Sequence, residues 1–246
     1  MGPLGSGTVF FSGCNLRCQF CQNYQISWEG KGEEISIQDL ADKMIWLQEQ
    51  GANNINLVTG FMYTPQIVEA LKIAKENGLT IPIVYNSSGY ESVQAFRLLD
   101  GIVDIYLPDF KYAYEDLAVR LSRANGYPEI ALEAIKEMMR QQPENVFDED
   151  GMLEKGVLIR HLVLPNHLQN SKQVLKKIKN TFGKEVYISV MAQYFPCYKA
   201  LELEDINRKL TQEEFDEIEN FVYQLDLKNG YIQYLEENEE KYVPNF

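Results

Sequence analysis

Three of the four cysteines lie within eight residues, at Cys14, Cys18 and Cys21, in a segment that reads SGCNLRCQFCQN from residue 12. Thiolates prefer soft metals such as zinc, copper(I) and the iron of iron–sulfur clusters. Two cysteines separated by two residues can bind one zinc ion. Three cysteines in one short loop suit a four-iron cubane, which normally takes four cysteine ligands. Three ligands leave one iron open, and an open position is what a catalytic metal site keeps.

A structural metal site is the alternative for the same loop. Cys197 comes just after the last predicted strand and could supply a fourth thiolate to a zinc ion or to a closed cluster. A buried and unreactive thiol is a further explanation for Cys197. Ligand chemistry favours the catalytic cluster, so Cys14, Cys18 and Cys21 are predicted as its metal ligands.

The elements that must position this loop alternate between short apolar runs and amphipathic helical patterns. The predicted strands are 8–12, 54–59, 81–86, 103–107, 157–164 and 185–191. The predicted helices are 36–50, 65–77, 90–99, 114–123, 128–140, 171–181 and 211–225. This alternation predicts an α/β fold, a partial (β/α)6 TIM-like barrel of parallel strands with the cysteine loop after strand 1. The chemistry of such folds gathers at the carboxyl ends of the strands.

The amino-acid composition restricts the classes of molecule that this protein is expected to bind. The 246 residues carry a net charge of −13 and are 45% hydrophobic and 24% charged, as is ordinary for a globular protein. An acidic surface lacks the attraction that most nucleic-acid binders use and is repelled by anionic lipid. No apolar run reaches the length of about 18 residues that a membrane helix needs. We therefore expect neither a nucleic acid nor a membrane as partner.

Segments at the two ends are set apart from the predicted domain. Residues 2–6 read GPLGS and look like the remnant of a protease-cleaved tag, so residues 1–6 are excluded from functional reasoning. Residues 7–235 are predicted to form one domain, and the acidic tail 236–246 is predicted to fray. The polar stretch 143–156 is predicted to be a loop or a small hairpin.

The cysteine segment resembles the signature of the radical S-adenosylmethionine (radical SAM) enzymes, Cys-x3-Cys-x-aromatic-Cys, with Phe20 as the aromatic residue. The resemblance extends to about residue 191 and is closest to the pyruvate formate-lyase activating enzymes and their activating-enzyme-like relatives. It is also carried by residues 83–90, 103–111 and 159–165. It implies a [4Fe-4S] cluster whose open iron binds S-adenosylmethionine. Reductive cleavage then gives methionine and a 5′-deoxyadenosyl radical that abstracts hydrogen from the substrate.

The resemblance also implies cofactor-binding residues at the strand ends. The Gly-Gly-Glu motif of the family falls on Thr59 and Gly60, with Met62 in place of the acid. Asn86 stands where the activating enzymes place an Asp near the adenosyl ribose, although a turn-forming Asn is an equal alternative. Asp109 and Lys111 resemble the Asp-Leu-Lys of the family, which places Lys111 by the cofactor or the substrate.

The last strands add further candidates. In strand 157–164, Arg160 and His161 must point to opposite faces, and Arg160 is the predicted cofactor contact while His161 is predicted to be packed. After strand 185–191, Gln193 falls where the family has a polar contact to the ribose. Cys197 is a candidate for returning a hydrogen atom to the product, so Lys111 and Cys197 are the predicted catalytic residues.

Three functions follow as hypotheses. The first is an activating enzyme that forms a glycyl radical on a protein partner, and the second is a radical SAM enzyme that modifies another peptide or a small metabolite. Shared cofactor chemistry does not fix the substrate. The third is a non-enzymatic zinc module with four cysteines. The resemblance also implies a flavodoxin or ferredoxin-like electron donor, and reduced thiolates predict a cytoplasmic protein.

Overall fold

The computed structural model describes residues 5–235, which form two sheets that share one stretch of chain. The strands are β1 Gly7–Phe10, β2 Ile55–Val58, β3 Ile83–Ser87, β4 Ile105–Pro108, β5 Val146–Phe147, β6 Leu153–Val157, β7 Ile159–Leu162, β8 Ile188–Met191 and β9 Gly230–Gln233. The first sheet has the order β1-β2-β3-β4-β6-β5, with β5 antiparallel to β6, and the second has the parallel order β7-β8-β9. Since β7 begins two residues after β6 ends, one segment serves both sheets.

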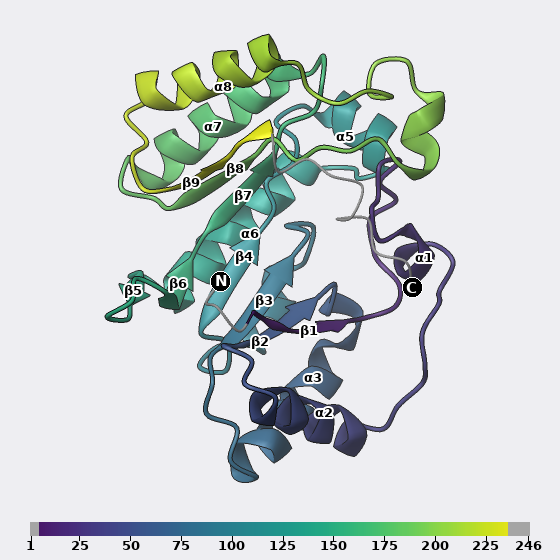
Figure 1. Cartoon of the computed structure of the whole chain (residues 1–246), viewed down its shortest axis with the longest axis vertical. Coiled ribbons are helices and arrows are strands. Elements are labelled where there is room, and N and C mark those ends of the chain that lie inside the picture. The colour runs from purple at the N-terminus through teal and green to yellow at the C-terminus, as the bar shows by residue number, and fades with distance from the viewer. Residues whose placement is uncertain (1–4, 236–246) are drawn as a thin grey trace.

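The two sheets join at the carboxyl end of β4. Asp109 pairs with Arg160 of β7 as a parallel bridge, and the Phe110 N–H donates to the Arg160 carbonyl at 2.8 Å. Through this joint β1, β2, β3, β4, β6–β7 and β8 follow one another as parallel strands, with β9 added beyond β8 (Figure 1). The α/β partial barrel predicted from the sequence is confirmed.

Helices connect the strands and cover the sheets. They are α1 Tyr24–Ser27, α2 Ile37–Glu49, α3 Thr64–Glu76, α4 Val93–Arg97, α5 Glu115–Ser122, α6 Tyr127–Gln141, α7 Leu168–Phe182 and α8 Gln212–Gln224, with 3₁₀ turns η1 Phe61–Tyr63 and η2 Tyr198–Glu202. Figure 1 shows α7 and α8 lying over β7–β9, while α2 and α3 lie on the side of β1 and β2. Helices thus pack against the strands of both sheets, as the apolar sequences of the strands require.

Local sequence explains where the helices start. Ser36 accepts from the Asp39 N–H while the Asp39 carboxylate accepts from the Ser36 N–H, which is a full capping box at the start of α2. Thr211 and Glu214 form the same arrangement before α8. The buried stripe of α2 includes Leu40, Ala41 and Met44, so the helix turns its apolar face to the core.

Most predicted elements are present with ends that differ by a few residues. The polar stretch 143–156 is a hairpin in which β5 pairs with β6, as one of the two predicted forms. Strand β9 and the short helix α1 were not predicted, because the first two residues of Gly230–Gln233 are exposed and α1 is one turn long. The structure describes only Gly5 and Ser6 of the predicted tag remnant, and the predicted tail 236–246 lies outside the described residues. No helix in residues 5–235 is long and apolar enough to cross a membrane.

Candidate functional site

The cysteine loop follows β1 and is held by backbone bonds from three elements. The N–H groups of Arg17 and Gln19 donate to Ser122 and Leu121 carbonyls at 2.9 and 2.8 Å, so the loop caps the carboxyl end of α5. The Gly13 N–H donates to Ile26 of α1 at 2.9 Å, and the Ala200 N–H of η2 donates to the Gln19 carbonyl at 2.9 Å. These bonds fix the loop at the carboxyl ends of the strands.

Arg17 also holds the loop with its side chain. Its Nη1 donates to the carbonyls of Cys14 at 2.8 Å, Leu16 at 3.3 Å and Ser27 at 3.1 Å. Asn15 adds a bond from its side-chain amide to the Tyr90 carbonyl in the loop after β3. The backbone between the first two cysteines is thus tied to both α1 and the β3 loop.

The three loop cysteines are half-buried free thiols that influence one another. Burial, reinforced by the neighbouring Cys18, raises the pKa of both Cys14 and Cys21 to about 12. Burial also raises the pKa of Cys18, while Lys111 and a hydrogen bond of 3.1 Å from the Ser122 hydroxyl oppose that shift. Three mutually interacting soft donors beside one cation fit an iron–sulfur cluster, whose binding replaces the thiol protons.

A single metal ion fits these residues less well. A zinc ion needs its ligands about 2.0–2.3 Å away from one point. Within residues 5–235, no group of three or more His, Cys, Asp or Glu side chains stands in position to hold one ion. Cys197 is buried, and its thiol donates to the Phe20 carbonyl at 3.6 Å. The described residues therefore do not form a four-cysteine zinc site.

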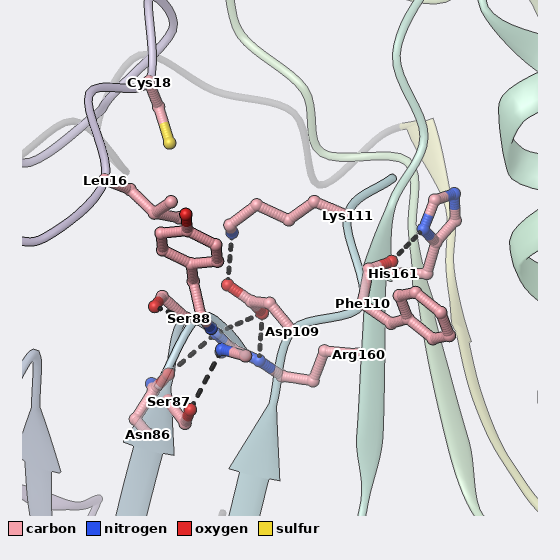
Figure 2. Close-up of polar contacts among 12 residues, drawn as sticks. Leu16, Cys18, Asn86, Ser87, Ser88, Asp109, Phe110, Lys111, Arg160 and His161 are labelled. Carbon is pink, nitrogen blue, oxygen red and sulfur yellow. Dashed lines mark hydrogen bonds and ion pairs between the residues drawn. The ribbon is translucent and has the colours of Figure 1, made fainter. Parts of the chain in front are cut away.

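A polar network lies beside Cys18, at the carboxyl ends of β3, β4 and β7 (Figure 2). Arg160 donates to the Asp109 carboxylate from Nε at 3.0 Å and from Nη2 at 2.7 Å, and from Nη2 to the Asn86 amide oxygen at 2.8 Å. Lys111 forms an ion pair with the other Asp109 oxygen. We call Asn86, Asp109, Lys111 and Arg160 the strand-end network. It brings together four of the residues that the sequence proposed.

Charge pairing fixes the protonation of this network. Burial alone would raise the pKa of Asp109, but Arg160 and Lys111 outweigh it and hold that pKa below its ordinary value. Burial would lower the pKa of Lys111, but the Asp109 carboxylate and the Cys18 sulfur raise it. One anion and two cations leave the network with excess positive charge, which suits a carboxylate ligand.

Strand alternation separates Arg160 from His161. The imidazole of His161 is buried, with Nδ1 at 2.7 Å from the Phe110 carbonyl and Nε2 at 2.8 Å from the Ser171 hydroxyl of α7. Burial lowers the pKa of His161 to about 4, so the ring is neutral near pH 7. As predicted, His161 is a packed and hydrogen-bonded residue rather than part of the network.

The end of β2 approaches the cysteine loop through its backbone. Thr59 has a left-handed φ of 62°, which a residue with a branched side chain rarely adopts. A Cβ on Gly60 would lie 2.6 Å from the terminal methyl group of Ile67, so a larger residue there would require that side chain to move. Met62 is 52% exposed, and its methyl group would lie 2.8 Å from a Cβ on Gly13. The Met62 side chain therefore lies against Gly13 of the cysteine loop.

Two further sequence candidates have other contacts. The Gln193 amide lies 3.9 Å from the Met191 sulfur. The Cys197 thiol is directed at the backbone of the cysteine loop, and burial raises its pKa to about 11. Neither has a recorded contact with the strand-end network, so their predicted roles stay predictions.

Sequence reasoning missed Ser122 and Glu91, whose hydrogen bonds hold residues at or next to the site. Ser122 was one residue of a predicted helix, although its hydroxyl bonds both Cys18 and, at 2.6 Å, the buried Tyr112. Glu91 is 4% exposed and accepts bonds from the Ser87 hydroxyl at 2.8 Å, the Tyr85 hydroxyl at 3.2 Å and the Ser88 N–H at 3.3 Å. The sequence signal that could have identified Glu91 was a carboxylate three residues after Ser88 in a turn.

Two relatives are similar to this chain over most of its length. A protein of Methanocaldococcus jannaschii, named as uncharacterized, is 36% identical over 232 residues, which are 90% of this chain and 64% of that protein. The chain thus spans somewhat less than two thirds of that relative. A pyruvate formate-lyase-activating enzyme of Clostridium pasteurianum is 26% identical over 73% of this chain and 70% of its own.

Solved structures share the fold. The FeFe-hydrogenase maturase HydG of Carboxydothermus hydrogenoformans aligns with a TM-score of 0.63 at 14% identity, over 97% of this chain and 55% of that chain. Streptococcus suis SuiB bound to the precursor peptide SuiA aligns with a TM-score of 0.64 at 12% identity, over 94% and 49%. The Radical SAM superfamily model matches residues 8–154, more than half of the chain. The protein belongs to the radical SAM superfamily, whose members use a [4Fe-4S] cluster and S-adenosylmethionine.

Proposed function

We propose that this radical SAM enzyme is activating-enzyme-like and abstracts a hydrogen atom from a glycine of a protein partner. When bound, the cluster and S-adenosylmethionine supply a 5′-deoxyadenosyl radical. The observation that carries the proposal is the strand-end network next to Cys18, built from the segments that resemble the activating enzymes. The Clostridium pasteurianum relative, named as a pyruvate formate-lyase-activating enzyme, supports the protein substrate.

Each residue has a proposed task. Cys14, Cys18 and Cys21 hold the cluster. Lys111 and Arg160 attract the carboxylate of S-adenosylmethionine, because they outnumber the one carboxylate between them.

The other contacts orient the cofactor. The Asn86 oxygen accepts from Arg160, and its N–H₂ group has no partner within residues 5–235, so that group is available to the ribose. Thr59 and Gly60 bring backbone to the methionine amine, with no acid there because Met62 stands at that position. Gln193 contacts the ribose, and Asp109 aligns the two cations.

The reaction also needs residues that exclude water and a protein that supplies the electron. Leu16 and Phe20 are buried in the cysteine loop and keep solvent from the reaction. An acidic flavodoxin or ferredoxin-like protein donates the electron. Free thiols that must bind the cluster and such a donor suit a reducing compartment, so we place the enzyme in the cytoplasm.

An anaerobic assay tests the proposal. The protein is loaded with iron and sulfide, reduced with dithionite and given S-adenosylmethionine, and 5′-deoxyadenosine is measured by chromatography. We expect product from the parent, none from Cys18→Ala, and full iron content in Cys197→Ala. A pyruvate formate-lyase is then added, and electron paramagnetic resonance detects a glycyl radical. Iron-loaded parent that forms no 5′-deoxyadenosine under any of these conditions would contradict the proposal.

A second substrate class is favoured by the end of β2. Met62 replaces the acid of the activating enzymes and covers Gly13 of the cysteine loop, which changes the wall of the site. An enzyme that modifies another peptide or a small metabolite, with Cys197 returning a hydrogen atom, fits this difference. Steady 5′-deoxyadenosine formation without a glycyl radical on the lyase would favour this candidate.

A further inference from the structure

Three cationic side chains converge on one indole ring beside the cysteine loop. Lys199 Nζ lies 4.8 Å from the centre of the Trp28 ring, and the guanidinium carbons of Arg17 and Arg123 lie 5.3 and 6.0 Å away. Each contact has the geometry of a cation–π interaction. This grouping of three cations around one ring is unusual for a chain whose net charge is −13. We call Arg17, Trp28, Arg123 and Lys199 the Trp28 surface.

The cations of this surface are not neutralised by neighbouring acids. In residues 5–235, neither Arg123 nor Lys199 has an ion pair with a carboxylate, whereas cations such as Arg120, Arg140 and Lys172 do. Arg123 is exposed and Lys199 is partly exposed, so both can meet an approaching protein. Clustered like charges raise the local potential and attract an acidic partner.

The three cations lie either in the cysteine loop or in segments that bond it. Arg17 lies in the loop and donates to the Cys14 carbonyl at 2.8 Å. Arg123 directly follows Ser122, whose carbonyl accepts from the Arg17 N–H and whose hydroxyl donates to Cys18. Lys199 belongs to η2, which donates to Gln19 through the Ala200 N–H. The surface therefore lies directly outside the predicted cluster ligands.

Aromatic rings continue this surface. Tyr198 stacks on Tyr24 of α1 with centroids 4.8 Å apart and planes at 11°, and its centroid lies 5.3 Å from that of Trp28. Tyr198 also has a left-handed φ of 53°, which a bulky residue adopts only when its surroundings hold it. The rings are thus packed against one another in fixed positions next to the cations.

We propose that the Trp28 surface is the docking surface for an acidic protein that carries a one-electron redox centre. This inference rests on the proposed function, because it assigns the entry point for the electron that the reaction consumes. The carrier is oxidised by one electron and the cluster is reduced by one, and no bond or proton changes at the surface. Electron-transfer complexes are small and weak, so complementary charge gives them their rate and orientation.

Charge reversal tests the docking surface by binding. Reduced flavodoxin is the probe, and its affinity for the cluster-loaded protein is measured anaerobically by biolayer interferometry at low and high salt. We expect Arg123→Glu/Lys199→Glu to weaken binding by at least tenfold, and its remaining affinity to depend little on salt. Lys43→Glu/Lys72→Glu makes the same charge change on the exposed faces of α2 and α3 and should bind within twofold of the parent.

Activity provides the second readout. With dithionite, which needs no docking surface, Arg123→Glu/Lys199→Glu should form 5′-deoxyadenosine at the parental rate, and with flavodoxin at less than a tenth of it. Equal weakening of flavodoxin binding by both double variants, or by neither, would overturn the docking surface. No 5′-deoxyadenosine from the parent with dithionite would instead count against the proposed function, and the binding result would still decide the docking surface.

Discussion

Asp109 carries the charge balance of the strand-end network, because it is the one carboxylate between Arg160 and Lys111. Asp109→Asn would leave two cations close together in a site where the three side chains are 13 to 23% exposed. Breaking a buried pair costs about 3–5 kcal/mol, and this partial exposure reduces the expected loss to about 2–3 kcal/mol. Urea unfolding monitored by circular dichroism measures it.

A second variant separates charge repulsion from lost hydrogen bonds. Lys111→Met added to Asp109→Asn removes one of the unpaired cations, so the double variant should recover roughly half of the lost stability. If the two substitutions destabilise additively, repulsion between Lys111 and Arg160 is not what Asp109 offsets.

Glu91 has no cationic partner among the described residues, and burial raises its pKa from 4.5 to about 7. Below pH 4.5 the carboxyl is protonated in both the folded and the unfolded chain. As the pH rises through about 7, the folded chain must bury a charge that the unfolded chain leaves in water, so stability is lost. The loss amounts to a free energy of unfolding on the order of 3 kcal/mol.

Glu91→Gln removes that pH dependence. The melting temperature of the variant minus that of the parent should therefore increase between pH 5 and pH 8, whatever constant offset the amide introduces. Glu76→Gln, which removes an exposed carboxylate at the end of α3, should give a flat difference. Parallel curves for Glu91→Gln and the parent would show that Glu91 is not the titrating group.

At the scale of elements, the loop after β3 packs directly against the loop after β4, with no room for an added side-chain atom. Gly89 has φ 76°, and a Cβ there would lie 2.2 Å from the Asp109 carbonyl oxygen. Gly89→Ala should therefore cost both left-handed strain and a backbone clash, at least about 3 kcal/mol. Differential scanning calorimetry measures the lowered melting temperature.

Gly78 is the matched control for that substitution. It ends the turn after α3 with φ 98°, and a Cβ there would meet nothing within 4 Å. Gly78→Ala should cost only the strain, about 1–2 kcal/mol. Similar losses for the two alanines would mean that the β4 loop moves aside, and that the close approach does not fix the site.

The elements that the sequence predicted well are those whose burial is visible in their own residues. Ile55–Val58 and Ile188–Met191 are each apolar at three of four positions, and the pair Ser36 and Asp39 marks the start of α2. Strand β9 escaped prediction because its first two residues are exposed, and it pairs with β8 over a Gly230 whose Cβ would lie 1.8 Å from Ile188 O. Such a strand is defined by its neighbour rather than by its own pattern.

At the scale of the whole molecule, the parallel barrel explains why part of the site was predictable. Strands of one direction end at one edge, so Asn86, Asp109 and Arg160 could be placed together without knowing any distance. The supporting contacts of Ser122 and Trp28 join elements about a hundred residues apart or lie between helices. No local pattern specifies such contacts, because they depend on how complete elements pack.

Cluster loading should then stabilise the molecule unevenly, because the cysteine loop is bonded to only some elements. Binding to the folded state alone raises stability, and 1 kcal/mol corresponds to about 2–4 °C for a chain of this size. We expect slower hydrogen exchange on anaerobic iron–sulfide loading in residues 13–23, at the carboxyl end of α5, in η2 and in the loop after β3. Exchange in α2 and in the β5–β6 hairpin should stay unchanged, as should all exchange in Cys14→Ala treated in the same way. Protection confined to residues 13–23 would contradict the bonded network, whereas protection spread evenly over the chain would point to general compaction instead.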